Sequence, residues 1–196
     1  MSSVNNPSIN SETNVSSFVF SPGDALPSSV LADLRTDHAG ETGAIFIYLG
    51  ILQFTRNSAL RVFAEHHMAT EKSHLLRIES WLPKAQYSSL LPLWRLAGFM
   101  TGALPALVSV RAFYVTIQAV ETFVNQHYYD QVRASESELR LAKLRQVLLD
   151  CQSDVVAHRD HLSAALGQRK TGLLLQFWSV LVGAASRAAV ALCRQV

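Results

Sequence analysis

Residues 71–74 read Glu-Lys-Ser-His. This stretch lies in a run with apolar residues at helical spacing, so we expect a helix over residues 57–81. Two side chains three positions apart on a helix are about 60° apart around its axis, so Glu71 and His74 can both reach one metal ion. A Glu-x-x-His pair by itself is usually solvated, so a metal site needs ligands from other helices.

Three further segments place acidic or histidine side chains where the apolar face of a helix should be buried. Glu41 lies on an apolar stripe, Glu121 lies inside an apolar run, and His158 comes one turn after Asp154. A lone Glu is thus followed thirty residues later by Glu-x-x-His, and another lone Glu is followed thirty-seven residues later by a second His. Helix pairs joined by turns bring such residues to one level of a bundle.

A shared metal site would explain these placements. Burying an unpaired carboxylate is costly, and joint coordination of a metal removes that cost. A Glu from each of two helices and Glu-x-x-His from two others form the donor set of a di-iron carboxylate site. Carboxylate oxygens stabilise Fe(III) and can bridge two ions, and neutral imidazole suits iron. The sequence therefore predicts a metal-binding helical bundle.

The pattern from residue 28 onward predicts an all-α fold, because strand alternation and hairpin turn signals are missing. The expected helices cover residues 28–55, 57–81, 88–108, 109–133, 135–166 and 171–192. Ser28-Ser29, Asn57 and a Ser135–Glu138 capping box are predicted N-terminal caps, and Gly167 is the predicted end of the fifth helix. Four of these segments are long and amphipathic, which favours a four-helix bundle.

The composition excludes several classes of protein. Hydrophobic residues make up 49% and charged residues 16% of the 196, so the chain has ample apolar surface for a core. Lys and Arg total 17 against 15 acidic residues, which does not favour a nucleic-acid partner. Two cysteines, Cys151 and Cys193, are expected to be buried free thiols. Residues 1–27, rich in Ser and Asn, are interpreted as a disordered leader before a domain over 28–196.

The apolar excess gathers in two segments, residues 90–108 and 173–192. The first approaches the length of a membrane span, but two prolines and Arg95 favour a helix lying in the membrane interface, with Trp94 and Arg95 at the headgroups. The second is expected to be a further membrane-facing element or a dimer surface. The alternative is a buried hairpin inside a helical core.

Five stretches together resemble the demethoxyubiquinone hydroxylase family, the ferritin-like di-iron monooxygenases of ubiquinone biosynthesis. These stretches are DHAGETGA (37–44), EKSHL (71–75), SSLLPLWRLAGFMTGAL (88–104), AVETFVNQHYYDQ (119–131) and DVVAHRDHL (154–162). The resemblance covers residues 30–196. It implies a ferritin-like bundle with two additional apolar helices, two iron ions, and O2-dependent hydroxylation of a demethoxyubiquinone-type polyprenyl quinone. The sequence does not indicate which reductant supplies the electrons.

The resemblance also implies the metal ligands. Matching positions are Glu41, Glu71, His74, Glu121 and His158. In the family, Glu71 corresponds to a bridging carboxylate, and a second bridging Glu stands three residues before the second imidazole. This chain has Val155 there, and Asp154 is implied either to substitute for that acid or to orient an imidazole. Supporting roles near the metals are implied for three more residues, Asp37, His127 and Tyr128. The pair His66-His67 is interpreted as helix surface.

Val155 leaves two functions open. One is the hydroxylase itself, and the other is an impaired or non-catalytic family member that binds quinone or lipid as an assembly subunit. Expected partners are a membrane surface and the quinone, with a lipid-binding protein and a second copy of the chain as further options. The chain is expected to be a peripheral membrane protein on the cytoplasmic face of a bacterial inner membrane.

Overall fold

A computed structural model describes residues 19–167 and 172–196, and its secondary structure in these ranges is entirely helical. The α-helices are α1 (Ser28–Phe54), α2 (Ser58–Glu79), α3 (Leu91–Val108), α4 (Val110–Ser135), α5 (Ala142–Leu166) and α6 (Leu173–Cys193). Two short 3₁₀ helices, η2 (Lys84–Gln86) and η3 (Leu139–Leu141), lie in the connections. The predicted all-α bundle of ferritin-like type is confirmed.

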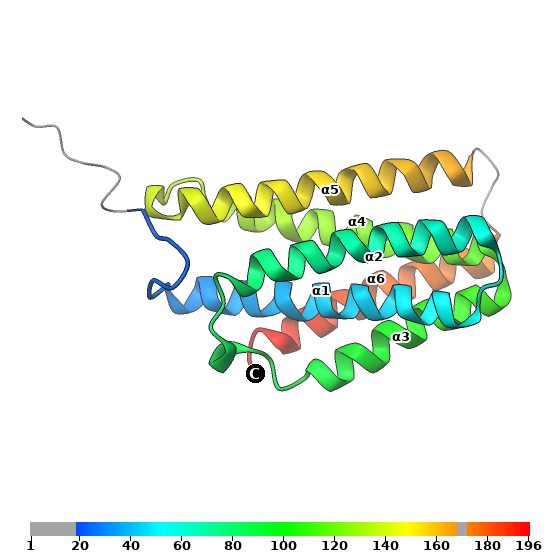
Figure 1. Ribbon diagram of the computed structural model, residues 1–196, viewed down its shortest axis with the longest axis horizontal. Coiled ribbons are helices and arrows are strands. Elements are labelled where there is room, and N and C mark those ends of the chain that lie inside the picture. Colours follow the sequence, from blue (N-terminus) through cyan, green and yellow to red (C-terminus); the bar gives the residue numbers. More distant parts are fainter. Residues whose placement is uncertain (1–18, 168–171) are drawn as a thin grey trace, which may run out of the picture.

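Four long helices form the bundle. α1 packs against α2, α4 packs against α5, and α2 meets α5, so that two helical hairpins lie side by side (Figure 1). Two apolar clusters fill its interior. Along α1, Leu34 belongs to the first cluster and Ile47 to the second, and Glu41 lies between them. The predicted ligands on α2, α4 and α5 are likewise flanked by the two clusters, which places a polar layer between two apolar ones.

The helix ends follow the sequence at some positions and depart from it at others. Asn57 caps α2 by accepting a hydrogen bond from the Leu60 N–H at 2.9 Å, and Gly167 ends α5 with a φ of 60°. The Ser135–Glu138 capping box is wrong. Ser135 ends α4 and donates its hydroxyl to the Val132 carbonyl, while α5 begins only at Ala142.

Glycines bring α1 and α3 into close contact. A Cβ at Gly102 would overlap the carbonyl oxygen of Ile47, and one at Gly98 would overlap the carbonyl oxygen of Gly43. On the α1 side, a Cβ at Gly50 would meet the α3 backbone at Phe99. The two backbones therefore touch directly, and α3 is held firmly on α1.

α3 and α6 are the two apolar helices, and both pack on the α1–α4 side of the bundle. Each is long and apolar enough to cross a membrane, yet only 22% and 6% of their apolar windows are buried. Their exposed residues include Leu93, Leu96, Leu107, Leu173, Leu174, Phe177 and Val180. This exposure contradicts the alternative of a hairpin buried in the core.

The predicted leader falls largely outside the described residues, at 1–18. In its remaining part, 19–27, two residues contact the bundle, since the Phe20 N–H donates to the Arg140 carbonyl at 2.8 Å and Leu26 is buried. Both Cys151 and Cys193 are buried free thiols, as predicted.

Candidate metal centre

Four helices bring the five predicted ligands to one place. Glu41 comes from α1, Glu71 and His74 from α2, Glu121 from α4 and His158 from α5. All five side chains are buried, and His74 is fully enclosed. Three buried carboxylates and two imidazoles in a protein interior need either mutual pairing or a metal ion.

The donors form two groups, each with potential ligand atoms within 4.8 Å of one another. The first group is Glu41, Glu71 and His74. The second group is His67, Glu121 and His158. Each group has the size and the donor types of a site for one metal ion.

Glu71 faces both groups. Its Oε2 lies 3.4 Å from Nδ1 of His74, and its Oε1 lies 3.7 Å from Nδ1 of His158. Within the groups, Glu41 Oε2 lies 3.6 Å from His74 Nδ1, and Glu121 Oε1 lies 3.5 Å from His158 Nδ1. A carboxylate that presents one oxygen to each group is placed to bridge two metal ions.

Unpaired polar atoms show that these donors fit a metal. Among the described side chains, seven buried nitrogen or oxygen atoms have no hydrogen-bond partner. Four of them belong to the two groups, namely Glu41 Oε2, His67 Nδ1, His74 Nδ1 and His158 Nδ1. Coordination by the lone pairs of these atoms would remove the free-energy cost of burying them unpaired.

The buried carboxylates of the polar layer favour the binding of protons or metal ions. Burial, together with the charge of Glu41, raises the pKa of Glu71 well above its usual range and that of Glu121 to about 8. Burial lowers the pKa of His74, but the nearby carboxylates of Glu41 and Glu71 raise it to about 12. Burial acts to raise the pKa of Glu41, but His74 outweighs it and lowers the pKa overall. Metal ions would replace the protons held by these residues.

Three neighbours hold the ligands in place. Nε2 of His74 lies 3.0 Å from Oδ2 of Asp154, so an N–H there points away from the centre and Nδ1 keeps a free lone pair toward it. The Tyr128 hydroxyl donates to Glu41 Oε1, and the Tyr48 hydroxyl donates to Glu121 Oε1 at 3.5 Å.

The other supporting residues named from the sequence contact each other rather than the donor groups. Asp37 lies one turn before Glu41, and its Oδ1 is 3.0 Å from His127 Nε2. Gln131 donates to the same oxygen at 2.6 Å. Burial raises the pKa of Asp37 overall, although the hydrogen bond and the charge of His127 act to lower it. This network links α1 to α4 beside the centre.

The sequence reasoning missed His67. Its neighbour His66 is exposed as expected, but His67 is 2% exposed, so the surface interpretation of that residue is wrong. Burial, followed by the charge of His158, lowers the pKa of His67 to about 3 and keeps the imidazole neutral. Its position four residues before Glu71 was the available signal, because residues four apart share a helix face.

Val155 lies where the family pattern has an acid. It is 1% exposed and packs in the first apolar cluster with Cys151 and Leu148. The position therefore supplies packing and no ligand atom.

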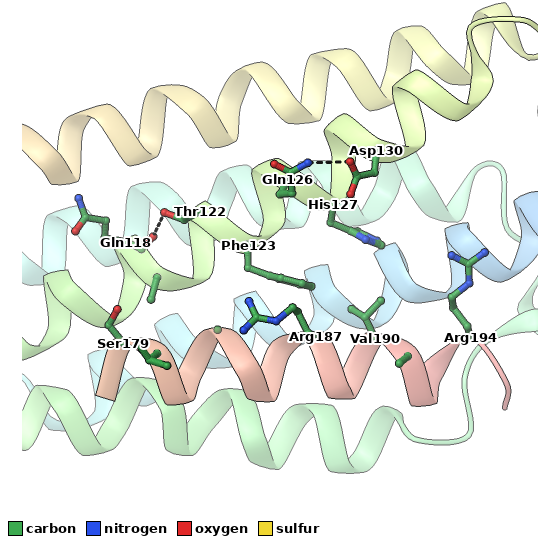
Figure 2. A pocket seen from close by; sticks show the side chains of 14 residues that line it. Gln118, Thr122, Phe123, Gln126, His127, Asp130, Ser179, Arg187, Val190 and Arg194 are labelled. Carbon is green, nitrogen blue, oxygen red and sulfur yellow. Dashed lines mark hydrogen bonds between the residues drawn. The ribbon is translucent and has the colours of Figure 1, made fainter. Parts of the chain in front are cut away.

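Two open grooves lie on the surface of the bundle. One, of about 500 Å³ between α2 and α5, is lined by His66, Ala69, Thr70, Ser73, Asp154, Ala157 and His158. The other, of about 750 Å³, lies between α4 and α6. Figure 2 shows Phe123 from α4 and Arg187 from α6 extending into the space between these helices.

Comparison with known proteins identifies a family for this chain. Residues 29–193 match the model of the family described as "Ubiquinone biosynthesis protein COQ7". The chain belongs to this family. The COQ7 match includes all six α-helices except the first residue of α1.

Individual COQ7-type relatives are similar at moderate identity. A Rhodospirillum rubrum protein named 3-demethoxyubiquinol 3-hydroxylase is 35% identical over 144 residues, which are 71% of this chain and 66% of that protein. A Rattus norvegicus protein named NADPH-dependent 3-demethoxyubiquinone 3-hydroxylase, mitochondrial, is 30% identical over 131 residues, 65% of this chain and 60% of that protein. The chain thus spans less than two thirds of the length of both relatives.

Proposed function

We propose that this chain catalyses the O2-dependent hydroxylation of a demethoxyubiquinone-type polyprenyl quinone in ubiquinone biosynthesis. The names of relatives from Rhodospirillum rubrum and Rattus norvegicus support this activity. The observation in this chain that carries the proposal is the pair of buried donor groups with Glu71 between them.

The metals in this proposal are two iron ions held by Glu41, Glu71, His74, Glu121 and His158. Bound iron would supply O2 activation and the transfer of one oxygen atom to the quinol ring. The protein orients the ligands: Asp154 fixes the His74 ring, and Tyr128 fixes Glu41. The apolar clusters on either side of the layer lower the local dielectric constant, which strengthens the electrostatic interactions of these groups.

The apolar helices support a membrane-surface location. α3 and α6 expose leucine and phenylalanine side chains on the α1–α4 side of the bundle, and the α4–α6 groove adjoins them. We propose that these helices rest in the lipid interface, and that the quinone reaches α4, the helix of Glu121, from that side. The α2–α5 groove opens elsewhere and would remain in water. The cytoplasmic face of a bacterial inner membrane, a lipid-binding partner and a homo-oligomer stay predictions.

The activity is tested with the full chain loaded anaerobically with Fe(II). With a reductant, a short-chain demethoxyquinol and ¹⁸O2, the expected product carries one ¹⁸O atom, detected by mass spectrometry. Glu71→Gln should abolish the product, because it removes the carboxylate shared by both groups. Glu65→Gln, on the exposed side of the same helix, is the matched control and should leave the product unchanged. An iron-loaded protein that makes no ¹⁸O-labelled product would contradict the proposal.

Val155 favours a second candidate, a non-catalytic subunit that binds quinone or lipid. A buried apolar residue takes the position of one expected acid, so the centre has three carboxylates. Iron content separates the two candidates. Two iron atoms per chain after anaerobic loading support the hydroxylase, and a content near zero supports the subunit.

A further inference from the structure

The two donor groups contain a residue that the family resemblance does not supply. With Val155 apolar, the matched ligands give the second group only Glu121 and His158, beside the shared Glu71. His67 is the third side chain of that group. Its presence gives the second group three donors of its own, in addition to the shared Glu71.

His67 lies on the face of α2 that points into the centre. It is one helical turn before Glu71, and its ring centroid is 3.9 Å from that of His158. The ring also stacks on Phe63, with centroids 3.9 Å apart and planes at 27°. Phe63 thereby holds the imidazole in a fixed orientation beside His158.

Packing alone does not account for an imidazole at this position. His67 is 2% exposed, and its Nδ1 has no hydrogen-bond partner in the described part of the chain. A phenylalanine would stack on Phe63 equally well without an unpaired buried nitrogen, which costs free energy. Glu121 Oε1 and His158 Nδ1 face the same space, and they are hard and borderline donors of the kind that iron accepts.

We propose that His67 is a metal ligand that replaces the coordination lost at Val155. The inference rests on the proposed two-metal centre. His67, Glu121 and His158 hold one ion, Glu41 and His74 hold the other, and Glu71 reaches both. The centre then has three carboxylates and three imidazoles. One helix, α2, supplies three of the six ligands at positions 67, 71 and 74.

Cobalt(II) is a suitable probe, because its absorption and paramagnetic NMR shifts report coordination directly. We expect the metal-free full chain, titrated anaerobically, to bind two Co(II) ions. Each ligating imidazole that keeps an N–H should give one exchangeable, strongly shifted proton resonance, so the native protein should show three. Two such resonances in the native protein would overturn the proposal without any substitution.

His67→Phe tests the ligand role while keeping the stack on Phe63. It should lower the affinity for one of the two Co(II) ions by at least about 100-fold and remove one shifted N–H resonance. His66→Phe, at the exposed neighbouring position, should match the native protein in both measurements. Circular dichroism and thermal unfolding confirm that each variant is folded.

The double variant His67→Phe with Val155→Glu tests whether an acid at position 155 can replace His67 as a ligand. A carboxylate at 155 lies three residues before His158, and it should restore binding of the second Co(II) ion with two shifted N–H resonances instead of three. If His67→Phe binds two ions with native affinity and spectrum, His67 is not a ligand, and the proposed hydroxylase still stands. If the native chain binds no Co(II) and no Fe(II), both proposals fail.

Discussion

Asp154 shows how one exposed acid can influence a buried centre. Its carboxylate is 46% exposed, yet it contacts Nε2 of His74, whose side chain is fully buried. An acceptor on Nε2 keeps the proton there and frees Nδ1 for coordination. The acid next to Val155 therefore has a role that does not require it to reach the metal.

Removing that acid should weaken metal binding. We expect Asp154→Ala to lower the affinity for one ion about 10–100-fold, because His74 loses the partner that fixes its tautomer and ring angle. The measurement is a competitive Co(II) titration against a chelator. Asp150→Ala, one turn earlier on α5 where the acid accepts a hydrogen bond from Gln146, is the control. Equal affinity for both variants would show that the Asp154 contact does not orient His74.

The residues of the centre differ in how well the sequence could predict them. Glu41, Glu71, His74, Glu121 and His158 could be selected because each interrupts an apolar helical face or completes a known spacing. His67 could not be separated from His66, since adjacent residues differ by about 100° around a helix and either could face inward. Only the packing of Phe63 and His158 around the ring determines which one is buried.

At the level of elements, helix existence was predictable and one connection was not. Asn57 and Gly167 act where local signals placed them, because each satisfies the backbone of its own helix end. The Ser135–Glu138 signal failed because Glu138 caps the short η3 helix instead, accepting from the Arg140 N–H at 3.2 Å. This 3₁₀ helix, Leu139–Leu141, carries the chain directly into α5 at Ala142. A local motif cannot reveal how many residues the connection between two packed helices requires.

The α1–α3 contact leads to a stability prediction. We expect Gly102→Ala to destabilise the fold by about 1–3 kcal/mol, since its Cβ would overlap a backbone carbonyl that cannot rotate away. Gly40→Ala, on α1 with no neighbouring atom within 4 Å of its Cβ, should instead stabilise by about 0.4–1 kcal/mol. Urea unfolding of the metal-free protein measures both. If both variants change the free energy of unfolding equally, the close contact between α1 and α3 does not contribute to stability.

The exposed face of α6 should govern membrane attachment. Burying a Leu or Phe side chain contributes about 1.5–3 kcal/mol, so replacing Leu173 and Phe177 together by Glu should weaken vesicle binding at least about tenfold. Co-sedimentation with phospholipid vesicles measures the change. Leu139→Glu, at an exposed leucine on η3, serves as the control. Unchanged binding of the α6 variant would exclude this face as the lipid contact.

The whole molecule should respond to pH through its buried acids. In the metal-free protein, pKa values of about 8 for Glu121 and about 12 for His74 mean that the fold holds protons that the unfolded chain releases. Stability should therefore fall as pH rises from 6.5 to 8. Each such group contributes a slope of up to about 1.4 kcal/mol per pH unit. Below that window, His67 and His158, whose pKa values are lowered mainly by burial, favour unfolding by acid.

Urea unfolding at several pH values after chelator treatment measures this slope. Glu121→Gln should reduce the slope between pH 6.5 and 8 by about one proton, or about 1.4 kcal/mol per pH unit. Loading with Fe(II) under anaerobic conditions should flatten the native profile, because the metal replaces the bound protons. If neither change alters the slope, the pH dependence of stability does not come from the buried acids and histidines of the polar layer.

The glycine contact between α1 and α3 has a consequence for substrate selection. With backbone against backbone, α3 cannot slide along α1, so the separation between α3 and Glu41 is constant. If α3 rests among lipid headgroups, the contact between α1 and α3 fixes the distance between the bilayer surface and the centre. A quinone would then be selected by how far its ring rises from the lipid, and the length of its tail would matter little.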